Sequence, residues 1–255
     1  MILTSKNNPL IKETASLKEK KGRKEHGLFL VEGVKMAREC LRSDFELERV
    51  FVAENYACDP DFLSKVSDKM ITVGADVLRF LSDEKTPQGV LCRVKIPQRQ
   101  MQSPKGNALF LDGVSDPGNV GAIIRSANAA GYEEIYLTRE CADPYSPKSV
   151  RASMSGVFFT KLYIGEREDI LNVLSGVPLI VADMHGENAF CFSAPKQFVL
   201  AIGNEANGIS VATRSAAKHI VSIPMSSTQE SLNAAVSAGI LMYVLKKDQF
   251  TEQSK

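Results

Sequence analysis

Three polar segments follow predicted strands and hold most of the side chains that could do chemistry. The first covers residues 112–128, where a turn rich in Gly, Pro and Asp leads into a helix that begins near Gly118. Exposed amides at a helix start favour anionic groups, and Arg125 lies within the same helix. An arginine in an apolar helix usually forms a structural salt bridge, so this segment alone does not separate an ion pair from a catalytic cation.

The second segment places Gly203, Asn204, Glu205 and Gly208 directly after an apolar strand. Glycine lets the backbone approach a ligand closely. Glu205 could pair with a cation or cap the helix that follows, and capping is the commoner role. Ligands of open α/β sheets bind beyond the carboxyl ends of the strands, so this segment stands where a binding loop is expected.

The third segment closes a strand at residues 223–225, and an irregular polar loop then leads to a helix that starts at about Ser231. Ser231 and Asn233 are good N-cap residues, which would be a structural role. Met225 and Leu232 could line an apolar slot, although core positions are commoner for such side chains. Each of the three segments is a weak signal by itself.

Strand and helix patterns alternate along the chain and divide at a polar connector over residues 97–107. The first region, 1–96, is expected to form strands at 29–31, 50–53 and 89–95 and helices at 34–41 and 59–66. The second region, 108–255, is expected to form strands at 108–113, 134–138, 159–164, 178–183, 198–203 and 219–223 and helices at 118–130, 147–154, 166–174, 208–216 and 231–245. This alternation predicts an α/β fold with a mainly parallel sheet in each region. Residues 248–255 are expected to fray.

Composition excludes several classes of protein. The chain has 255 residues, 44% of them apolar, so one or two domains with a real core are expected. No run approaches the ~20 apolar residues of a membrane span, and the first residues lack the apolar stretch of a secretory signal. The cysteines form no C-x-x-C pair and the histidines are far apart, so no metal site or disulfide framework is expected. We therefore expect a soluble cytoplasmic protein. The cysteines are Cys40, Cys58, Cys92, Cys141 and Cys191.

The charge is nearly balanced overall, at +1, but it is not evenly distributed. Residues 1–24 hold two acidic side chains, Glu13 and Glu19, and a larger set of basic ones. A basic stripe can contact phosphates with salt-dependent affinity, and the alternative is a solvated helix face. The basic residues are Lys6, Lys12, Lys18, Lys20, Lys21, Arg23 and Lys24. All of these except Lys12 are our candidates for contacts with the phosphates of a nucleic acid.

In this order and spacing, the three polar segments resemble the three motifs of the SpoU branch of the SPOUT methyltransferases. The resemblance covers about residues 107–246 and implies a catalytic domain over 108–255 with a mainly parallel sheet and a deep trefoil knot. The region 1–96 is similar to the small α/β substrate-binding domain, related to ribosomal proteins, that often precedes this domain. Residues 3–11 and 29–33 carry that looser likeness.

The resemblance implies transfer of a methyl group from S-adenosylmethionine to a ribose 2′-hydroxyl of structured RNA, with S-adenosylhomocysteine as product. It also implies roles for matching residues. The catalytic set is Asn119, Arg125, Glu205, Ser231 and Asn233, with Gly121 in the same first motif. The donor-binding set is Gly203, Asn204, Gly208, Ile223, Met225 and Leu232, with Pro224 beside them. One departure is Ser227, which stands where the family often has glycine.

A ribose hydroxyl is a poor nucleophile, so catalysis needs in-line positioning and help with the hydroxyl proton. The family's arginine is held to act on the 2′-hydroxyl, which implies that role for Arg125. Because an arginine pKa above ~12 makes a general base demanding, we favour electrostatic stabilisation of the 2′-oxygen, with the proton lost to phosphate or water. We expect the three bends to converge beside a buried Arg125 guanidinium.

The predicted helix over residues 231–245 is apolar nearly all round, which indicates burial. An isologous interface would cover it, and the resemblance implies a homodimer with its active site at that interface. The alternative is that the sheet of the same chain covers the helix.

Two other functions remain open at this stage. One is an RNA-binding or ribosome-assembly factor without catalysis, and the other is a nucleotide-dependent oxidoreductase, for which the G-x-G-x-x-G motif is missing. Within the methyltransferases, transfer RNA is the alternative to ribosomal RNA, and the separate first region favours ribosomal RNA.

Overall fold

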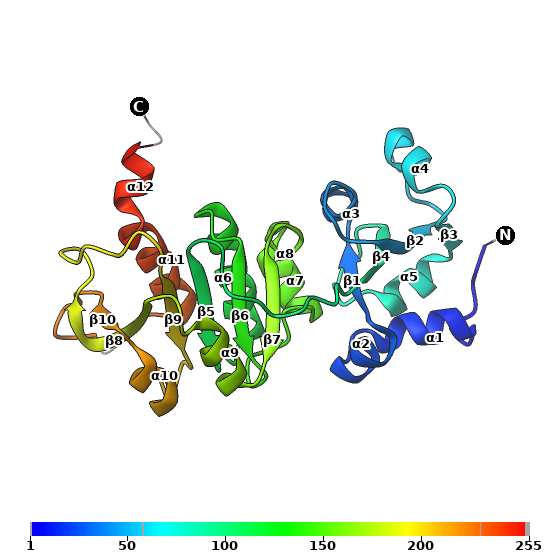
Figure 1. Ribbon diagram of the computed structural model, residues 1–255. Coiled ribbons are helices and arrows are strands. Elements are labelled where there is room, and N and C mark those ends of the chain that lie inside the picture. Colours follow the sequence, from blue (N-terminus) through cyan, green and yellow to red (C-terminus); the bar gives the residue numbers. More distant parts are fainter. Residues whose placement is uncertain (1, 58, 230, 253–255) are drawn as a thin grey trace. The chain divides into compact units, whose positions relative to one another are not determined.

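The computed structural model describes residues 2–57, 59–229 and 231–252, so Cys58 lies outside the described residues. The chain divides into two units (Figure 1). Met1–Gln98 and Asp143–Phe158 form the first, and Arg99–Ala142 and Phe159–Lys255 form the second. The expected domains at 1–96 and 108–255 and the linker at 97–107 stay predictions.

The first unit contains a four-stranded sheet in the order β1-β4-β2-β3. Its strands are β1 (Leu28–Glu32), β2 (Leu47–Ala53), β3 (Met70–Val73) and β4 (Val90–Lys95). Strand β4 is antiparallel to both of its neighbours, and only β2 and β3 are parallel. The expectation of a mainly parallel sheet is therefore wrong for this unit. Strand–helix alternation does not fix direction, because the loop over residues 82–89 lets the chain re-enter the sheet from its other end.

Short helices surround this sheet. They are α1 (Pro9–Ser16), α2 (Lys20–His26), α3 (Val34–Leu41), α4 (Pro60–Val66), α5 (Ala75–Leu81) and α7 (Pro147–Ser153), with α8 (Gly156–Phe159) following. The sequence-based predictions missed α1, α2, α5, α8 and β3. Buried Ile11 and Leu17 pack with Val77 and Leu81 in one core cluster. The Phe29 ring packs against Tyr145, with centroids 5.0 Å apart, so the segment Asp143–Phe158 contributes to this unit.

The second unit contains a six-stranded sheet in the order β10-β8-β9-β5-β6-β7, and every pairing is parallel. Its strands are β5 (Ala108–Asp112), β6 (Glu134–Thr138), β7 (Lys161–Gly165), β8 (Leu179–Asn188), β9 (Val199–Gly203) and β10 (His219–Ser222). The parallel sheet expected for this region is confirmed. Such strands are buried on both faces, and β5 and β6 are buried along their whole length.

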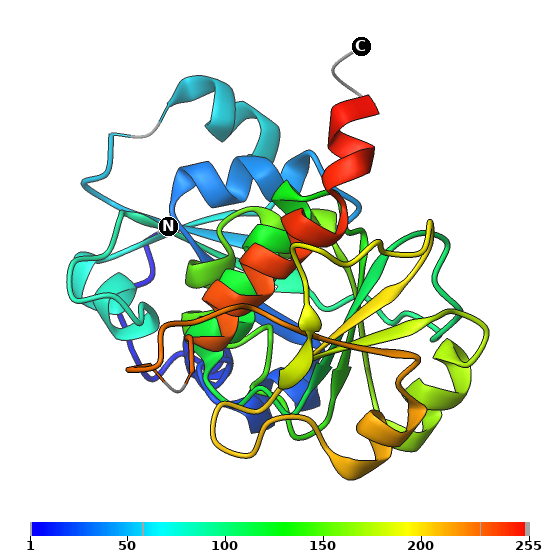
Figure 2. The same cartoon turned by 90° about the vertical axis from the view of Figure 1, so that its left-hand side faces the viewer.

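Helices cover both faces of this sheet. Successive side chains of a strand point to opposite sides, so these apolar strands present apolar side chains on both faces. The helices are α6 (Pro117–Ala129), α9 (Arg167–Leu174), α10 (Val211–Ala216) and α11 (Ala234–Leu245), and α12 (Lys247–Glu252) follows α11. Phe110 and Tyr136 pack with Ile170 and Leu174 of α9 on one face. Helix α11 packs against α6 and against β9 (Figure 2).

Helix α12 extends through residues that were expected to fray, and residues 253–255 lie outside the described part of the chain. Helix α11 continues into α12 after Lys246, whose ammonium donates to the carbonyl oxygen of Ala130 at 2.7 Å. That contact ties the end of α11 to the end of α6. None of the helices in the described residues has the length and apolar character needed to cross a bilayer.

Candidate active site

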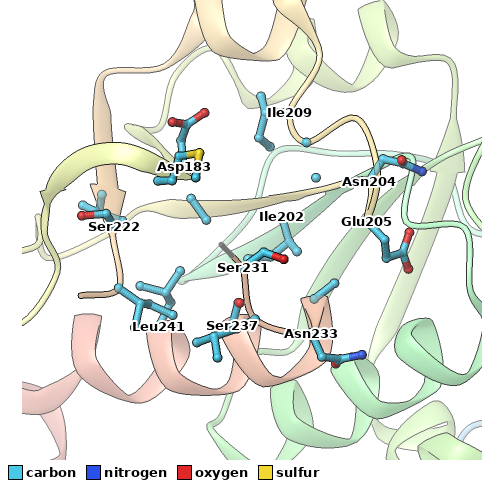
Figure 3. Close-up of a pocket in the computed structure, with 18 of the residues that line it drawn as sticks. Asp183, Ile202, Asn204, Glu205, Ile209, Ser222, Ser231, Asn233, Ser237 and Leu241 are labelled. Carbon is cyan, nitrogen blue, oxygen red and sulfur yellow. The ribbon is translucent and has the colours of Figure 1, made fainter. Parts of the chain in front are cut away.

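A cavity of about 510 Å³ lies at the carboxyl ends of β9 and β10 and beside the middle of β8 (Figure 3). Asn233, Ser237 and Leu241 reach it from the start and body of α11, and Asp183 and Ile209 lie on the opposite side. Every lining residue comes from one of four stretches: 182–184, 202–209, 221–225 and 231–241. The second and third polar segments therefore form most of the cavity wall.

Nine of the predicted site residues line this cavity. They are Gly203, Asn204, Glu205, Gly208, Ile223, Met225, Ser231, Leu232 and Asn233. Asn119 and Arg125 do not line it. The second and third motifs therefore line the cavity together. The first motif does not line it, and its position is given by its hydrogen bonds to the other two motifs.

The loop after β9 is a tight turn that only small residues allow. Asn204 and Gly208 exchange two backbone hydrogen bonds of 2.9 Å each. A Cβ on Gly203 would lie 2.3 Å from the carbonyl carbon of Gly208, and Gly208 itself has φ +66°. A side chain at either position would be strained. The Asn204 amide donates to the Gly113 carbonyl at 2.8 Å, which fixes this turn to the loop that follows β5.

A relay of side chains joins the three motifs. The Asn119 amide nitrogen donates to Glu205 Oε1 at 2.8 Å. The Asn233 amide nitrogen donates to Asn119 Oδ1 at 2.9 Å. Asn233 is also the N-cap of α11, since its Oδ1 accepts from the Ala235 and Val236 amides. Residues that are far apart in the sequence therefore meet through Asn119 at the edge of the cavity.

Glu205 binds the start of the first motif instead of capping the helix that follows it, which Ser210 caps. One carboxylate oxygen accepts from the Ser115 amide and hydroxyl, each at 3.0 Å, and the other accepts from the Asp116 amide at 3.2 Å. Partial burial raises the pKa of Glu205. Hydrogen bonds from Asn119 and from these amides outweigh burial and lower the pKa to about 2. The side chain is therefore ionised at neutral pH.

This lowered pKa predicts a pH-dependent contribution to folding. Because the folded-state pKa lies below the ordinary value of 4.5, the stability from Glu205 is full above that value and is lost as pH falls toward about 2. The gap in unfolding free energy between the wild type and Glu205→Gln should shrink between about pH 6 and about pH 3. Denaturant unfolding of both proteins checks this, and a gap that does not change with pH would contradict it.

The expectation that the Arg125 guanidinium is buried is wrong for the single chain. Arg125 lies on α6 but is exposed in the single chain, and among the described residues it has no hydrogen-bond or ion-pair partner. In the described part of the chain Arg125 therefore forms no structural salt bridge, and its guanidinium is not buried. The reason is helical geometry, because α6 turns Val120, Ile124 and Ala127 toward the sheet and leaves Arg125 on another face.

Sequence reasoning missed the wall contributed by β8. Strand β10 pairs with β8 at Val181 and next at Glu187, so residues 182–186 bulge out of the ladder. Asp183 and Met184 of this bulge line the cavity. An ion pair with Arg214 of α10 and a 2.9 Å bond from the His185 amide hold Asp183. The one signal available was Gly186, where a Cβ would lie 2.6 Å from the Val221 backbone.

The departure at Ser227 leaves no strain. Ser227 lies in a turn closed by a 3.1 Å bond from the Gln229 amide to the Ser226 carbonyl. Among the described residues, Met154 is the non-glycine residue with a positive φ, so Ser227 adopts an ordinary conformation. Glycine is not required at this position.

The basic residues of the first unit are only partly available to a ligand. Lys6, Lys20, Lys21 and Lys24 are exposed. Lys18 is half-buried and donates to two carbonyl oxygens. Arg23 was expected to be available for RNA contacts, but it is not. It is 4% exposed, pairs with Asp143 at 2.7 Å and donates to the Leu17 carbonyl, so it supports the fold.

Comparison with known proteins agrees with this geometry. Residues 106–243 match the model of the SpoU rRNA Methylase family, and residues 8–92 match the MRM3-like substrate binding domain. The chain is 26% identical to the 23S rRNA (guanosine(2553)-2'-O)-methyltransferase RlmP of Bacillus subtilis, over 96% of this chain and 98% of that protein. It is 29% identical to the 23S rRNA (uridine(2479)-2'-O)-methyltransferase of Streptomyces viridochromogenes, over 94% and 90%.

A solved structure is similar over nearly the whole length. The AdoMet-bound rRNA methyltransferase from Sinorhizobium meliloti superposes with a TM-score of 0.87 at 28% identity, over 97% of this chain and 98% of that chain. The family match spans more than half of the sequence and includes all three motifs that the relay joins. The chain therefore belongs to the SpoU rRNA methylase family.

Proposed function

We propose that this protein transfers a methyl group from S-adenosylmethionine to a ribose 2′-hydroxyl of ribosomal RNA. The observation that carries this proposal is the relay from Glu205 through Asn119 to Asn233, which links the three motifs at the edge of the cavity. Relatives that match over almost the whole chain are named as 23S rRNA 2′-O-methyltransferases, which favours ribosomal RNA over transfer RNA.

The cavity fits a cationic donor. Its volume of about 510 Å³ lies within the ordinary range for small-molecule sites. Ile202, Leu232 and Leu241 provide apolar wall, and the charged residues among its lining are Asp183 and Glu205, both acidic. A sulfonium and an ammonium group are therefore electrostatically favoured there. The backbone at Gly203, Ile223 and Leu232 would hold adenine and ribose, with Asn204, Gly208 and Met225 beside them.

The reaction is a displacement at carbon. When bound, S-adenosylmethionine supplies an electrophilic methyl carbon that already carries its leaving group. A bond forms between the ribose 2′-oxygen and the methyl carbon, the carbon–sulfur pair stays on sulfur, and the hydroxyl proton passes to water or phosphate. Arg125 would stabilise charge on the 2′-oxygen. Asn119, Glu205, Ser231 and Asn233 would fix the loops that orient donor and acceptor, so the chain's contribution is positioning and electrostatics.

We propose that two copies of the second unit form an isologous dimer through α6 and α11. Helix α11 buries Ala238, Leu241, Met242 and Leu245, but its other face exposes Val236 at 50% and Tyr243 at 46%. An exposed apolar face on so apolar a helix indicates an interface.

Arg125 would lie at the same proposed interface. A Cβ on Gly239 of α11 would lie 4.0 Å from the Ser126 hydroxyl of α6, so the two helices cross closely at these small residues. Arg125 precedes Ser126, and Val236 and Tyr243 lie one turn to either side of Gly239. A partner seated on this surface would cover Arg125 and bring it toward a cavity.

Replacing Val236 by glutamate should therefore give a monomer that has lost most of its transfer activity, because a buried unpaired charge opposes association. Sedimentation velocity and a transfer assay check both effects. Val211→Glu is the matched control, since Val211 is 82% exposed on α10 of the same unit. A wild type that is monomeric at micromolar concentration would contradict the dimer.

The same proposal includes a trefoil knot in the second unit and a cytoplasmic location. The turn after β9 and the segment between β10 and α11 would form the deep trefoil knot that the family resemblance implies, since both border one cavity. A ribosomal RNA substrate also favours a cytoplasmic location.

A direct assay tests the function. Purified protein is mixed with donor labelled in its methyl group and with unmodified ribosomal or transfer RNA, and the RNA is digested to nucleosides. We expect label in a 2′-O-methylated nucleoside of ribosomal RNA. Label in transfer RNA alone would change the substrate, and RNA binding without donor binding would favour a non-catalytic assembly factor.

A further inference from the structure

Phe80 is an aromatic residue on the exposed side of helix α5, which it shares with the charged residues Asp76 and Arg79. Val77, Leu78 and Leu81 face the core, whereas Phe80 is 38% exposed. A polar residue is the usual choice at such a position. A ring that stays in contact with water gains little of the free energy that burial of its apolar surface would provide. The position is therefore a candidate for contact with a ligand.

Two ammonium groups from separate segments converge on this ring. Lys6 precedes α1 and Lys18 lies between α1 and α2, and each Nζ is 5.7 Å from the Phe80 centroid. Lys18 is held in place, since it donates to the carbonyl oxygens of Phe80 at 2.6 Å and of Ser82 at 2.9 Å. Lys6 is exposed and can move without breaking a hydrogen bond to any described residue.

Three of the carboxylates near this ring are paired with other cations. Asp83 and Glu84, just after α5, pair with Arg151 at 2.8 Å and 2.9 Å. Glu13 of α1 pairs with Arg93 at 2.6 Å. The surface around Phe80 thus combines an aromatic face with two ammonium groups, Lys6 and Lys18, that form no ion pair with any described residue.

We propose that Phe80 stacks against an unpaired base of the RNA substrate, with Lys6 and Lys18 beside the adjoining phosphates. An aromatic face and cations together match a nucleotide, which has a flat base and an anionic phosphate. Base stacking is stronger than an exposed cation–π contact, so a base can displace Lys6 from the ring toward a phosphate. The base must be unstacked, so the ligand is a loop or bulge and not a continuous duplex. This inference rests on the proposed RNA substrate.

The chain contains no tryptophan, so Phe80→Trp creates a single fluorescent reporter in the full-length protein. Deproteinised ribosomal RNA should quench this fluorescence, and a fully paired RNA duplex should not. Tyr56→Trp is the matched control, because Tyr56 has the same 38% exposure in the same unit without the lysines. Equal quenching of both reporters would overturn the proposal.

Affinity supplies the second readout. Phe80→Ala should lower affinity for ribosomal RNA about tenfold, Phe80→Tyr should retain it, and donor affinity should be unchanged in both. RNA binding of Phe80→Ala at wild-type affinity would overturn the stacking role while leaving the methyltransferase intact. A wild type that binds neither donor nor RNA would instead count against the proposed function.

Discussion

Replacing Arg125 by alanine is expected to lower the rate of methyl transfer by at least about a hundredfold, the usual cost of losing one electrostatic stabiliser of a developing oxyanion. Donor affinity should stay close to that of the wild type, because Arg125 does not line the cavity. Folding stability should also be unchanged, since the side chain is exposed and has no partner among the described residues. Single-turnover transfer and calorimetric titration of the donor separate these effects.

Arg139→Ala is a suitable control, because Arg139 is another exposed arginine of the same unit and forms a surface pair with Glu166. It should transfer methyl groups at the wild-type rate. Arg125→Lys should recover part of the lost rate if charge near the 2′-oxygen is what matters. Full activity of Arg125→Ala would remove its assigned role.

Glu205→Gln should weaken donor binding by about tenfold or more, the range expected when hydrogen bonds to a charged group are lost. The Glu205 carboxylate accepts hydrogen bonds from Ser115, Asp116 and Asn119, and each of these groups acts as a donor. A glutamine amide nitrogen would face those donors instead of accepting from them. The loops after β5 and β9 would then separate and the cavity wall would loosen.

Calorimetric titration of the donor into the variant checks this expectation. Glu133→Gln is the control, because Glu133 is 78% exposed, pairs only loosely with Lys161 and lies away from the cavity lining. Unchanged donor affinity in Glu205→Gln would mean that the relay does not shape the donor site.

The second unit was largely predictable because its sequence signals are local. Continuous apolar runs mark the buried strands, and cap residues such as Asp116 and Asn233 mark helix starts, each with side-chain bonds to backbone amides. Three loops after three strands were therefore placed correctly near one another. The start of α11 was displaced only from about Ser231 to Ala234, with Asn233 as its cap.

The features that were missed depend on distant parts of the chain. The bulge at residues 182–186 exists because β10 pairs with two separate stretches of β8, and no local pattern encodes that pairing. The direction of β4 depends on where a loop re-enters the sheet. The exposure of Arg125 follows from which face of α6 meets the sheet, which its residue type does not reveal. Arg23 is buried because Asp143 reaches it from a segment far along the chain.

The most direct test of this account is a crystal structure of the protein with S-adenosylmethionine or its product bound. We predict density for the ligand in the cavity bordered by the turn at 203–208 and the segment 223–233, with a two-fold partner seated on α6 and α11. Saturating donor that leaves this cavity empty, or that binds elsewhere on the chain, would contradict the central claim.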